Sequence, residues 1–537
     1  MTNPFLTLEG VTHVLPDGRT LFSDLNETFD ARRTGLVGRN GVGKTVLARI
    51  LAGRITPSAG RCLGSGRVHY LVQQVAVPAG SNVAALAGVR AVLDALARIE
   101  EGSVAPEDFE IVNERWDMRE RLGHALAQHG LEHLDAHTPA HRLSGGEAMR
   151  VALVGAWLSE ADILILDEPS NHLDRPSRRA LMAQLQRWPR GLLVVSHDRQ
   201  LLDTMQRIVE LSPLGLRSHG GNYTFYARCR AQEQQNALAQ LELCKHERRR
   251  EQQAMRIERE RQERRQARGA QQGKQANQAK ILLDRQKERS ESAAGRLNRQ
   301  QSLSREQLDQ RVREAARQVQ DEAAIVLRTL PVTQAAQRRV AELDEVQLPF
   351  VSASTRAITL TLTGQQRVGV VGPNGCGKST LLNVLAGRLP PVAGTCKVVA
   401  EHVFLDQRLA DLYPQCSVLE QMQSANRNAT EADLRTRLAQ LGLDAAMIER
   451  PSAALSGGER LKAALACALH ADLPPRLLLL DEPSNHLDLA STQALETMLQ
   501  GYRGALVVVS HDDVFLESLG LTHRLMATSE GWRMEPW

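Results

Sequence analysis

The chain has 537 residues, 42% of them hydrophobic, which is enough for two or three domains with full cores. It contains no apolar run near the roughly 20 residues that span a bilayer and no basic-then-apolar N-terminal signal, so we expect a cytoplasmic protein without a membrane subunit. The formal charge of +4 is unevenly distributed: residues 227–340 hold 26 Lys+Arg against 15 Asp+Glu, a net of +11, and the remainder holds 40 against 47, a net of −7. Such segregation indicates a polyanionic partner for the basic segment.

A glycine-rich loop follows the first predicted strands. Residues 1–30 alternate short apolar runs with turn residues, and residues 35–37 predict a strand. A loop that fits GxxxxGK[ST] comes next, and residues 46–52 predict a helix. In such a loop, glycines let backbone N–H groups surround phosphate oxygens, and the helix N-terminus adds partial positive charge. One loop alone could be a flexible glycine turn, but the same arrangement recurs around residues 368–385.

A nine-residue acidic segment is also present twice without a change, as residues 166–174 and 480–488, LDEPSNHLD. Each copy continues an apolar run, at residues 163–165 and 477–479. This pattern predicts a buried strand that delivers two adjacent carboxylates to a site at its C-terminal end. The carboxylates are Asp167 and Glu168 in the first copy, and Asp481 and Glu482 in the second.

Three further elements recur at matched positions. Gln73 and Gln407 each follow the loop lysine by 29 residues, and His197 and His511 each follow the first aspartate of the acidic strand by 30 residues. The segment LSGGE stands at residues 143–147 and again at 455–459. Each element alone is a weak signal, since a lone glutamine or histidine is usually structural. Together, in one order and twice, they indicate an internal duplication of a nucleotide-binding module.

These motifs resemble the phosphate loop, glutamine loop, signature, acidic strand and switch histidine of ATP-binding cassette ATPases. Two cassettes in one chain and the form EPSNHLD resemble subfamily F, whose members are ribosome-associated. The resemblance implies an α/β fold with two P-loop cassette domains joined by a long α-helical coiled-coil hairpin. The expected domains are residues 1–226 with a short helical arm near 85–118, a basic helical linker at 227–340, and residues 341–537.

The resemblance also implies that the cassettes pair head to tail within a monomer, so that each ATP lies between one phosphate loop and the other signature. ATP would be bound by Gly38, Arg39, Asn40, Gly41, Val42, Gly43, Lys44, Thr45, Gln73, Ser144, Gly145 and Gly146, and by Gly372, Pro373, Asn374, Gly375, Cys376, Gly377, Lys378, Ser379, Gln407, Ser456, Gly457 and Gly458. Mg²⁺ would be held by Thr45, Gln73 and Asp167, and in the other site by Ser379, Gln407 and Asp481. Glu168 and Glu482 would polarise the attacking water, and His197 and His511 would hydrogen-bond the γ-phosphate. Asp174 and Asp488 would contact the opposite cassette, and both sites would hydrolyse ATP.

The contact with adenine is not marked in the sequence. Cassettes of this family usually stack the base on an aromatic residue before the phosphate loop. The first cassette offers His13, Val14 and Leu15 there, and Phe350 is the only aromatic near the second loop.

Two insertions distinguish the chain. The first cassette has 22 additional residues between its glutamine and its signature, which predict helices over 83–99 and 106–128; these form either an arm or a plain extension. The segment 227–340 predicts helices over 227–268 and 298–328, with a basic tip between them. Its candidate RNA-binding residues are Lys274, Lys280, Arg285, Lys287, Arg289 and Arg296. A solvated charged coiled coil is the alternative.

The leading interpretation is an ATPase that binds the ribosome, acts on translation, and places its linker against ribosomal RNA and tRNA through phosphate contacts. A ribosome-protecting antibiotic resistance factor of the same subfamily is an alternative that the sequence leaves open. A transporter ATPase subunit would not explain the basic linker. A DNA-repair or chromosome-structure protein would carry zinc-binding cysteines or longer coiled coils, and the seven cysteines include no CxxC pair.

Overall fold

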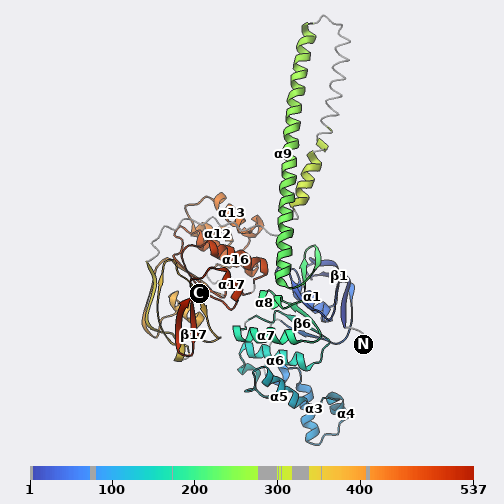
Figure 1. Ribbon diagram of the computed structural model, residues 1–537, viewed down its shortest axis with the longest axis vertical. Helices are drawn as coiled ribbons and strands as arrows, with labels where there is room; N and C mark the ends of the chain where they lie inside the picture. Colours follow the sequence, from blue (N-terminus) through green and yellow to red (C-terminus); the bar gives the residue numbers. More distant parts are fainter. Residues whose placement is uncertain are drawn as a thin grey trace. The chain divides into compact units, whose positions relative to one another are not determined.

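The computed structural model describes residues 4–72, 80–171, 173–275, 299, 302–303, 305–316, 338–351, 353–406, 412–485 and 487–537. The chain forms two compact units, one of residues 1–226 and 324–537 and one of residues 227–323. The first unit holds two α/β modules with the same order of strands, which confirms the predicted fold class (Figure 1). The predicted domain limits and the assignment of residues 85–118 to an arm stay predictions.

The first module, or first cassette, combines two sheets. A three-stranded antiparallel sheet has the order β2-β1-β4, and a six-stranded sheet has the order β5-β6-β7-β3-β8-β9 with only β9 antiparallel to its neighbour. The strands are β1 (Phe5–Val14), β2 (Thr20–Phe29), β3 (Arg33–Val37), β4 (Ala59–Ser65), β5 (Val68–Leu71), β6 (Ile163–Asp167), β7 (Gly191–Val195), β8 (Arg207–Ser212) and β9 (Gly215–Gly220).

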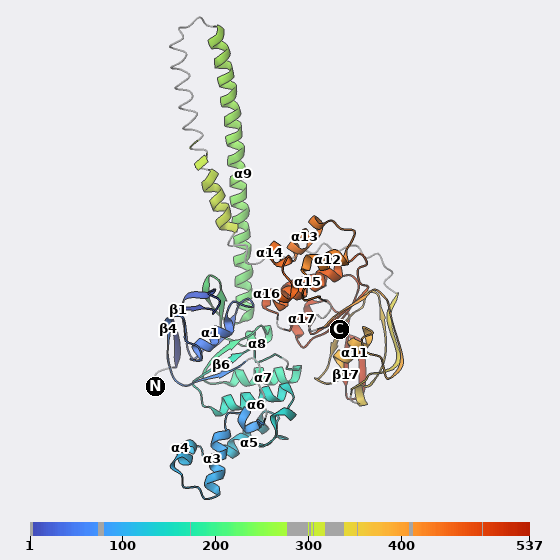
Figure 2. The ribbon, with the colours of Figure 1, turned by 180° about the vertical axis from the view of Figure 1, so that it is seen from behind.

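The larger sheet separates two hydrophobic cores because neighbouring side chains of a strand point to opposite faces. Ile163 and Ile165 of β6 pack with helix α1 (Lys44–Leu51) and the small sheet. Leu164 and Leu166 pack instead with α6 (Gly145–Leu158) and α7 (Arg175–Arg187). Figures 1 and 2 show α1 on the β1 side of the sheet and α6 and α7 on the other side. Every residue of β6 is buried, and its apolar run ends with Asp167 at the carboxyl end of the strand.

The second cassette repeats this plan. Its sheets have the orders β11-β10-β13 and β14-β15-β16-β12-β17-β18, and β15 divides its residues between two cores as β6 does. The strands are β10 (Arg339–Gln347), β11 (Ala357–Thr363), β12 (Arg367–Val371), β13 (Ala393–Val398), β14 (His402–Leu405), β15 (Leu477–Asp481), β16 (Ala505–Val509), β17 (His523–Thr528) and β18 (Gly531–Pro536). The helices that flank the large sheet are α11 (Lys378–Leu385), α15 (Gly457–Leu469), α16 (Leu489–Gly501) and α17 (Asp513–Ser518); α8 (Arg199–Asp203) is the counterpart of α17 in the first cassette.

The helical regions between strands and signatures differ between the cassettes. The first contains α2 (Val83–Leu86), α3 (Arg90–Glu100), α4 (Pro106–Val112) and α5 (Met118–Gln128), and the second contains α12 (Val418–Ala425), α13 (Glu431–Gln440) and α14 (Ala445–Ile448). The two helical stretches predicted over 83–99 and 106–128 are helical, but each is divided into two helices. Gly88 at φ 68° and Asn113 at φ 47° take positive φ values, which an α-helix cannot continue. The remaining short elements are 3-10 turns at Ala140–Arg142, Ala353–Thr355 and Ser452–Ala454.

The second unit is helical wherever the structure describes it. Helix α9 (Tyr223–Gln275) enters this unit at Ala227 and extends beyond the predicted end at residue 268. The helical stretch 305–316 packs antiparallel on it: Leu241, Cys244 and Ala315 form a small core, and Arg248 lies 3.3 Å from Asp309. The predicted helix over 298–328 lies partly outside the described residues. Among the helices that the structure describes, none is long and apolar enough to cross a membrane.

Candidate functional site

The two phosphate loops hold their lysines in the same way. Nζ of Lys44 donates to the carbonyls of Gly38 and Arg39 at 2.8 and 3.0 Å, and Lys378 makes the two equivalent bonds at 2.9 Å. Both lysines are buried at the start of a helix, α1 or α11. Each lysine therefore lies over its own loop, directed to the space where the helix N-terminus favours a phosphate group.

Glycine is required immediately before each lysine. Gly43 and Gly377 take φ values of 104° and 100°. A Cβ at Gly43 would lie 2.6 Å from a methyl carbon of Leu21, and one at Gly377 would lie 2.8 Å from Val351. Any larger residue would be strained at this φ and would clash with Leu21 in the first loop or Val351 in the second.

The second carboxylate of each acidic strand end lies on a strained backbone. Glu168 has φ 49° and Glu482 has φ 47°, a conformation that costs energy in residues with a side chain. The backbone N–H of Glu168 donates to Val195 at 2.8 Å, and Glu482 makes the same bond with Val509 at 2.9 Å. The two positions share this strain, which turns both carboxyl groups out of the strand direction toward the switch histidines.

Each of these carboxyl groups lies beside a histidine. Nε2 of His197 is 3.4 Å from Oε1 of Glu168, and Nε2 of His511 is 3.4 Å from Oε1 of Glu482. Burial raises the pKa of Glu168 to about 8 and that of Glu482 to about 7. Burial also lowers the pKa of each histidine to about 3, so both imidazoles are neutral near neutral pH. A carboxyl group with a pKa near 7 is well suited to accept a proton from water.

The first carboxylate of each strand end is prepared for a cation. The side chain of Asp167 is hydrogen-bonded to Thr45 and that of Asp481 to Ser379. Oδ1 of each aspartate is buried and has no hydrogen-bond partner among the described residues. Tyr70 donates its hydroxyl to Oδ2 of Asp167 at 3.2 Å. Orphaned carboxylate oxygens beside a hydroxyl fit a hard cation such as Mg²⁺, which prefers oxygen ligands.

Both signature serines cap helices. Ser144 and Glu147 form a reciprocal capping box at the start of α6, and Ser456 and Glu459 form the same box at α15. Gly145 and Gly457 are the first residues of these helices, with no atom within 4 Å of an added Cβ. In each cassette, the helix N-terminus beside this glycine therefore has free space around it. A helix N-terminus of this kind can bind an anion.

The acidic segments connect the two cassettes. Oδ2 of Asp488 accepts a bond from the backbone N–H of Asn40 at 2.8 Å, and Asp174 accepts one from the backbone N–H of Asn374. Each phosphate loop thus contacts the opposite cassette, as expected. A cavity of about 370 Å³ at the second loop is lined by Phe350, the phosphate loop, Glu482 and His511 among others, all from the second cassette. Ser144, Gly145 and Gly146 are not among its described lining residues, so the sharing of ATP with the opposite signature stays a prediction.

Arginines outside the motifs line the cassette interface, and three of them are largely buried or half-buried. Arg175 pairs with Asp513, Arg199 pairs with Glu496 at 2.8 Å, and Arg178 donates to the carbonyl of His511 at 3.0 Å. Every one of these donors belongs to the first cassette and every acceptor to the second. A comparison of the two repeats could have found them: the equivalents of Arg175, Arg178 and Arg199 are Leu489, Thr492 and Asp513, so no arginine is duplicated.

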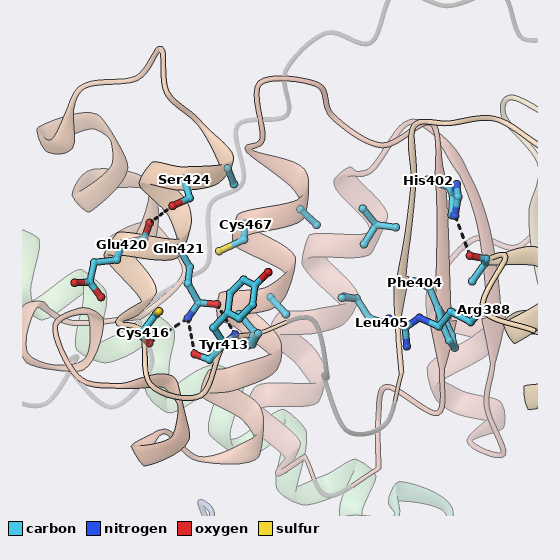
Figure 3. Close-up of a pocket in the computed structure, with 16 residues that line it drawn as sticks. Arg388, His402, Phe404, Leu405, Tyr413, Cys416, Glu420, Gln421, Ser424 and Cys467 are labelled. Atoms are coloured by element: carbon cyan, nitrogen blue, oxygen red, sulfur yellow. Dashed lines mark hydrogen bonds between the residues drawn. The ribbon is translucent and has the colours of Figure 1, made fainter.

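A larger cavity of about 780 Å³ lies elsewhere in the second cassette (Figure 3). Arg388, His402, Phe404 and Leu405 line it on the strand side, and residues of α12 and α15 line it on the helical side. Its polar groups largely bond one another. Gln421, for example, accepts from the backbone N–H of Tyr413 and donates to Ser452. No residue of the phosphate loop or acidic strand end lines it, so this cavity is not the nucleotide site.

Several predicted residues lie outside the described part of the chain. They are Gln73, Gln407, Lys280, Arg285, Lys287, Arg289 and Arg296. Lys274 belongs to α9. Their predicted roles stay predictions.

Similar proteins share both cassettes. The family model described as ABC transporter matches residues 24–171 and 355–485. The tylosin resistance ATP-binding protein TlrC of Streptomyces fradiae is 31% identical over an alignment that covers 94% of each chain. The energy-dependent translational throttle protein EttA of Mycobacterium tuberculosis is 29% identical, with 93% of this chain and 87% of that protein covered. ABC transporter F family member 5 of Arabidopsis thaliana is 28% identical, with 96% and 73% covered.

Solved structures share the fold at lower sequence identity. The RNase-L inhibitor aligns with a TM-score of 0.56 at 18% identity and covers 98% of this chain and 90% of its own. The archaeal ribosome recycling factor aABCE1, solved in complex with the ribosomal stalk protein aP1, aligns with a TM-score of 0.57 at 18% identity, with 98% and 89% covered. This likeness establishes the tandem-cassette fold.

Proposed function

We propose that this chain, which belongs to subfamily F of the ATP-binding cassette ATPases, binds the ribosome and couples ATP hydrolysis to an action on translation. The observation that carries the proposal is the likeness to a translational throttle protein over 93% of the chain, which includes both cassettes and the basic segment between them. The net charge of +11 on residues 227–340 supports an RNA partner, because Lys and Arg side chains neutralise phosphates.

Each hydrolysis site would use the same division of work. ATP phosphates would replace the carbonyl partners of Lys44 and Lys378, and the loop N–H groups would surround them. Asp167 with Thr45, and Asp481 with Ser379, would hold Mg²⁺, which neutralises charge on the phosphates when it is bound. Gln73 and Gln407 are assigned to the same sites by the resemblance.

The proton of the attacking water would pass to Glu168 or Glu482. Their raised pKa values mean that each carboxylate, once it is ionised, binds a proton more strongly than an ordinary glutamate does, as a general base requires. His197 and His511, neutral and within 3.4 Å of these carboxyl groups, would orient them and offer an N–H to the γ-phosphate. Because both sites hold the same groups, both are expected to hydrolyse ATP.

The base of ATP would stack on Phe350 in the second site. This side chain is 94% exposed and lines the cavity that also contains Lys378 and Ser379. An exposed aromatic ring beside a phosphate loop offers a flat face for a base. In the first cassette His13 is half-buried against Phe22, with 6.1 Å between ring centroids, so the two sites would hold adenine differently.

The test is retention on ribosomes. A Glu168→Gln/Glu482→Gln variant binds ATP without cleaving it and is expected to co-sediment with ribosomes in ATP but not in ADP. Wild-type chain in ADP is the matched control. A trapped variant that stays in the supernatant would exclude the proposal.

The linker is tested separately. Deletion of residues 265–298 from the trapped variant is expected to abolish co-sedimentation while ATPase activity of the corresponding wild-type deletion persists. Raising the salt concentration is expected to weaken binding steeply, since phosphate contacts release counterions. Retention of the deleted variant at unchanged strength would remove the linker from the interface.

A ribosome-protecting resistance function is the second candidate, favoured by the likeness to a tylosin resistance protein over 94% of both chains. It predicts that the purified chain restores translation in an extract inhibited by tylosin, and that the Glu168→Gln/Glu482→Gln variant does not. A general translation factor would leave the inhibition unchanged.

A further inference from the structure

Arg178 of the first cassette lies between the loop that contains His197 and the loop of the second cassette that contains His511. Its Nη1 donates to the backbone carbonyl of His511 at 3.0 Å, and its Nε is 3.3 Å from Oδ2 of Asp198. Asp198 directly follows His197 in the sequence. The guanidinium side chain is only 12% exposed, so its interactions are little screened by solvent. One side chain therefore joins the loops that carry the two switch histidines.

The two contacts of Arg178 are not equivalent. Oδ1 of Asp198 already caps α8 by accepting from Gln200 and Leu201 at 3.0 and 3.2 Å. The facing Nε and Oδ2 are close but not aligned for a hydrogen bond. The contact with His511 is thus a well-formed hydrogen bond, whereas Asp198 holds the guanidinium group by charge attraction.

The second cassette offers no counterpart. Arg178 stands four residues after Asp174, and Thr492 stands four residues after Asp488. Thr492 is buried and uncharged. Burial raises the pKa of Glu482 to about 7 while Lys378 and Arg178 oppose that rise; for Glu168 the opposing side-chain charge is that of Lys44. The second site therefore receives a cation from across the interface, and the first site faces a threonine.

We propose that Arg178 is a positioning residue for the second hydrolysis site. By holding the backbone of His511 from the opposite cassette, it makes the placement of this histidine beside Glu482 depend on cassette pairing. When the cassettes separate, His511 loses its contact with Arg178. The first site loses no equivalent contact. Hydrolysis in the second site is thus linked to closure more tightly than hydrolysis in the first. The inference rests on the proposed assignment of Glu482 and His511 to the second site.

The test isolates each site. A Glu168→Gln background confines hydrolysis to the second site, and a Glu482→Gln background confines it to the first. Arg178→Thr installs the residue found at the equivalent position. In the Glu168→Gln background it is expected to lower kcat by about tenfold or more, the effect of losing a hydrogen bond from a charged group, with KM for ATP within about twofold. In the Glu482→Gln background kcat is expected to stay within about twofold.

Two matched variants separate positioning from general damage. Arg187→Thr makes the same replacement at an exposed position of the same helix, α7, and is expected to leave both backgrounds unchanged. Arg178→Lys keeps a donor and a charge, and is expected to recover part of the lost kcat. Each variant is also checked for ATP binding, which a misfolded cassette would lose.

The outcomes separate the role of Arg178 from the assignment of the hydrolysis sites. If Arg178→Thr lowers kcat equally in both backgrounds, or in neither, the positioning role is wrong. If adding Glu482→Gln to the Glu168→Gln chain leaves turnover unchanged, the site assignment itself is wrong, whatever Arg178→Thr does.

Discussion

Nη1 of Arg199 in the first cassette lies 2.8 Å from Oε1 of Glu496 in the second, and their side chains are 12% and 9% exposed. Taking both charges out of water costs free energy that their attraction offsets only while they stay together. The pair therefore sets a condition on cassette pairing: a chain that loses one partner keeps a buried charge without compensation.

Arg199→Ala is expected to destabilise the paired cassettes by about 3–5 kcal/mol, and Arg199→Ala/Glu496→Ala by much less, because the double variant buries no lone charge. Burial raises the pKa of Glu496, so in the single variant this carboxyl group takes up a proton more readily as the pH falls. The destabilisation should therefore shrink in acid. Urea denaturation near pH 8 and pH 5 measures both effects.

The control for this pair is Arg32→Ala. Its partner Asp30 and Arg32 itself are exposed, so the loss should stay below about 1 kcal/mol. Equal destabilisation by the single and double variants at Arg199 and Glu496 would contradict the buried-charge explanation.

Glu168→Gln is expected to stabilise the fold in mild alkali. Burial raises the pKa of Glu168 from 4.5 to about 8, so the folded chain keeps a proton that the unfolded chain releases. Stability conferred by the protonated form is complete below pH 4.5 and is lost as the pH rises through about 8. Glutamine has no proton to lose. The variant's gain in melting temperature, measured by calorimetry, should accordingly be larger near pH 8.5 than near pH 5. As a control, Glu101→Gln changes an exposed residue and should alter the melting temperature equally at both pH values.

Phe350→Ala is expected to weaken ATP binding in the second site by about 1–3 kcal/mol, the contribution of one base stacked on an aromatic ring. In a Lys44→Ala background, calorimetric titration reports the second site. The loss should be similar for GTP, since stacking does not read hydrogen-bonding edges. Tyr413→Ala removes another exposed ring of the same cassette, one that lines the larger cavity, and should have no effect. Unchanged affinity in Phe350→Ala would assign the base contact elsewhere.

Asn113→Gly is expected to stabilise the first cassette by about 1 kcal/mol. Asn113 ends α4 at φ 47° and ψ −123°, a conformation that glycine reaches without steric cost. Asn113→Ala should destabilise, because alanine keeps the Cβ and loses the polar side chain. Denaturant midpoints of the three proteins give the order; equal midpoints for the glycine and alanine variants would mean that no strain is stored there.

The repeated motifs predicted the fold because their order and spacing are properties of the chain alone, whereas the roles of the site residues follow from the resemblance and stay predictions. LDEPSNHLD, read as a buried strand with carboxylates at its end, matches the buried strands β6 and β15. The left-handed backbone of Glu168 and Glu482 could not be predicted in this way, since glutamate rarely adopts it without tertiary constraint.

Interface residues were harder to predict for a different reason. Arg178 looks like an ordinary helix residue, and its meaning comes only from the carbonyl of His511, 333 positions away in the chain. The helix breaks at Gly88 and Asn113 were missed because a single positive φ interrupts a helix without changing the hydrophobic periodicity around it.

Arg175, Arg178 and Arg199 all lie on the first cassette and their acceptors all lie on the second, so the two sides of the interface differ in charge. Two first cassettes brought together would set Arg199, in the place of Asp513, against Arg175, and two second cassettes would set Asp513, in the place of Arg199, against Glu496. Like charges without partners in a dry contact are strongly disfavoured. The charges therefore disfavour pairing between two identical cassettes of neighbouring copies. Even at high concentration, only a first cassette and a second cassette together satisfy these charges, and each chain already contains both.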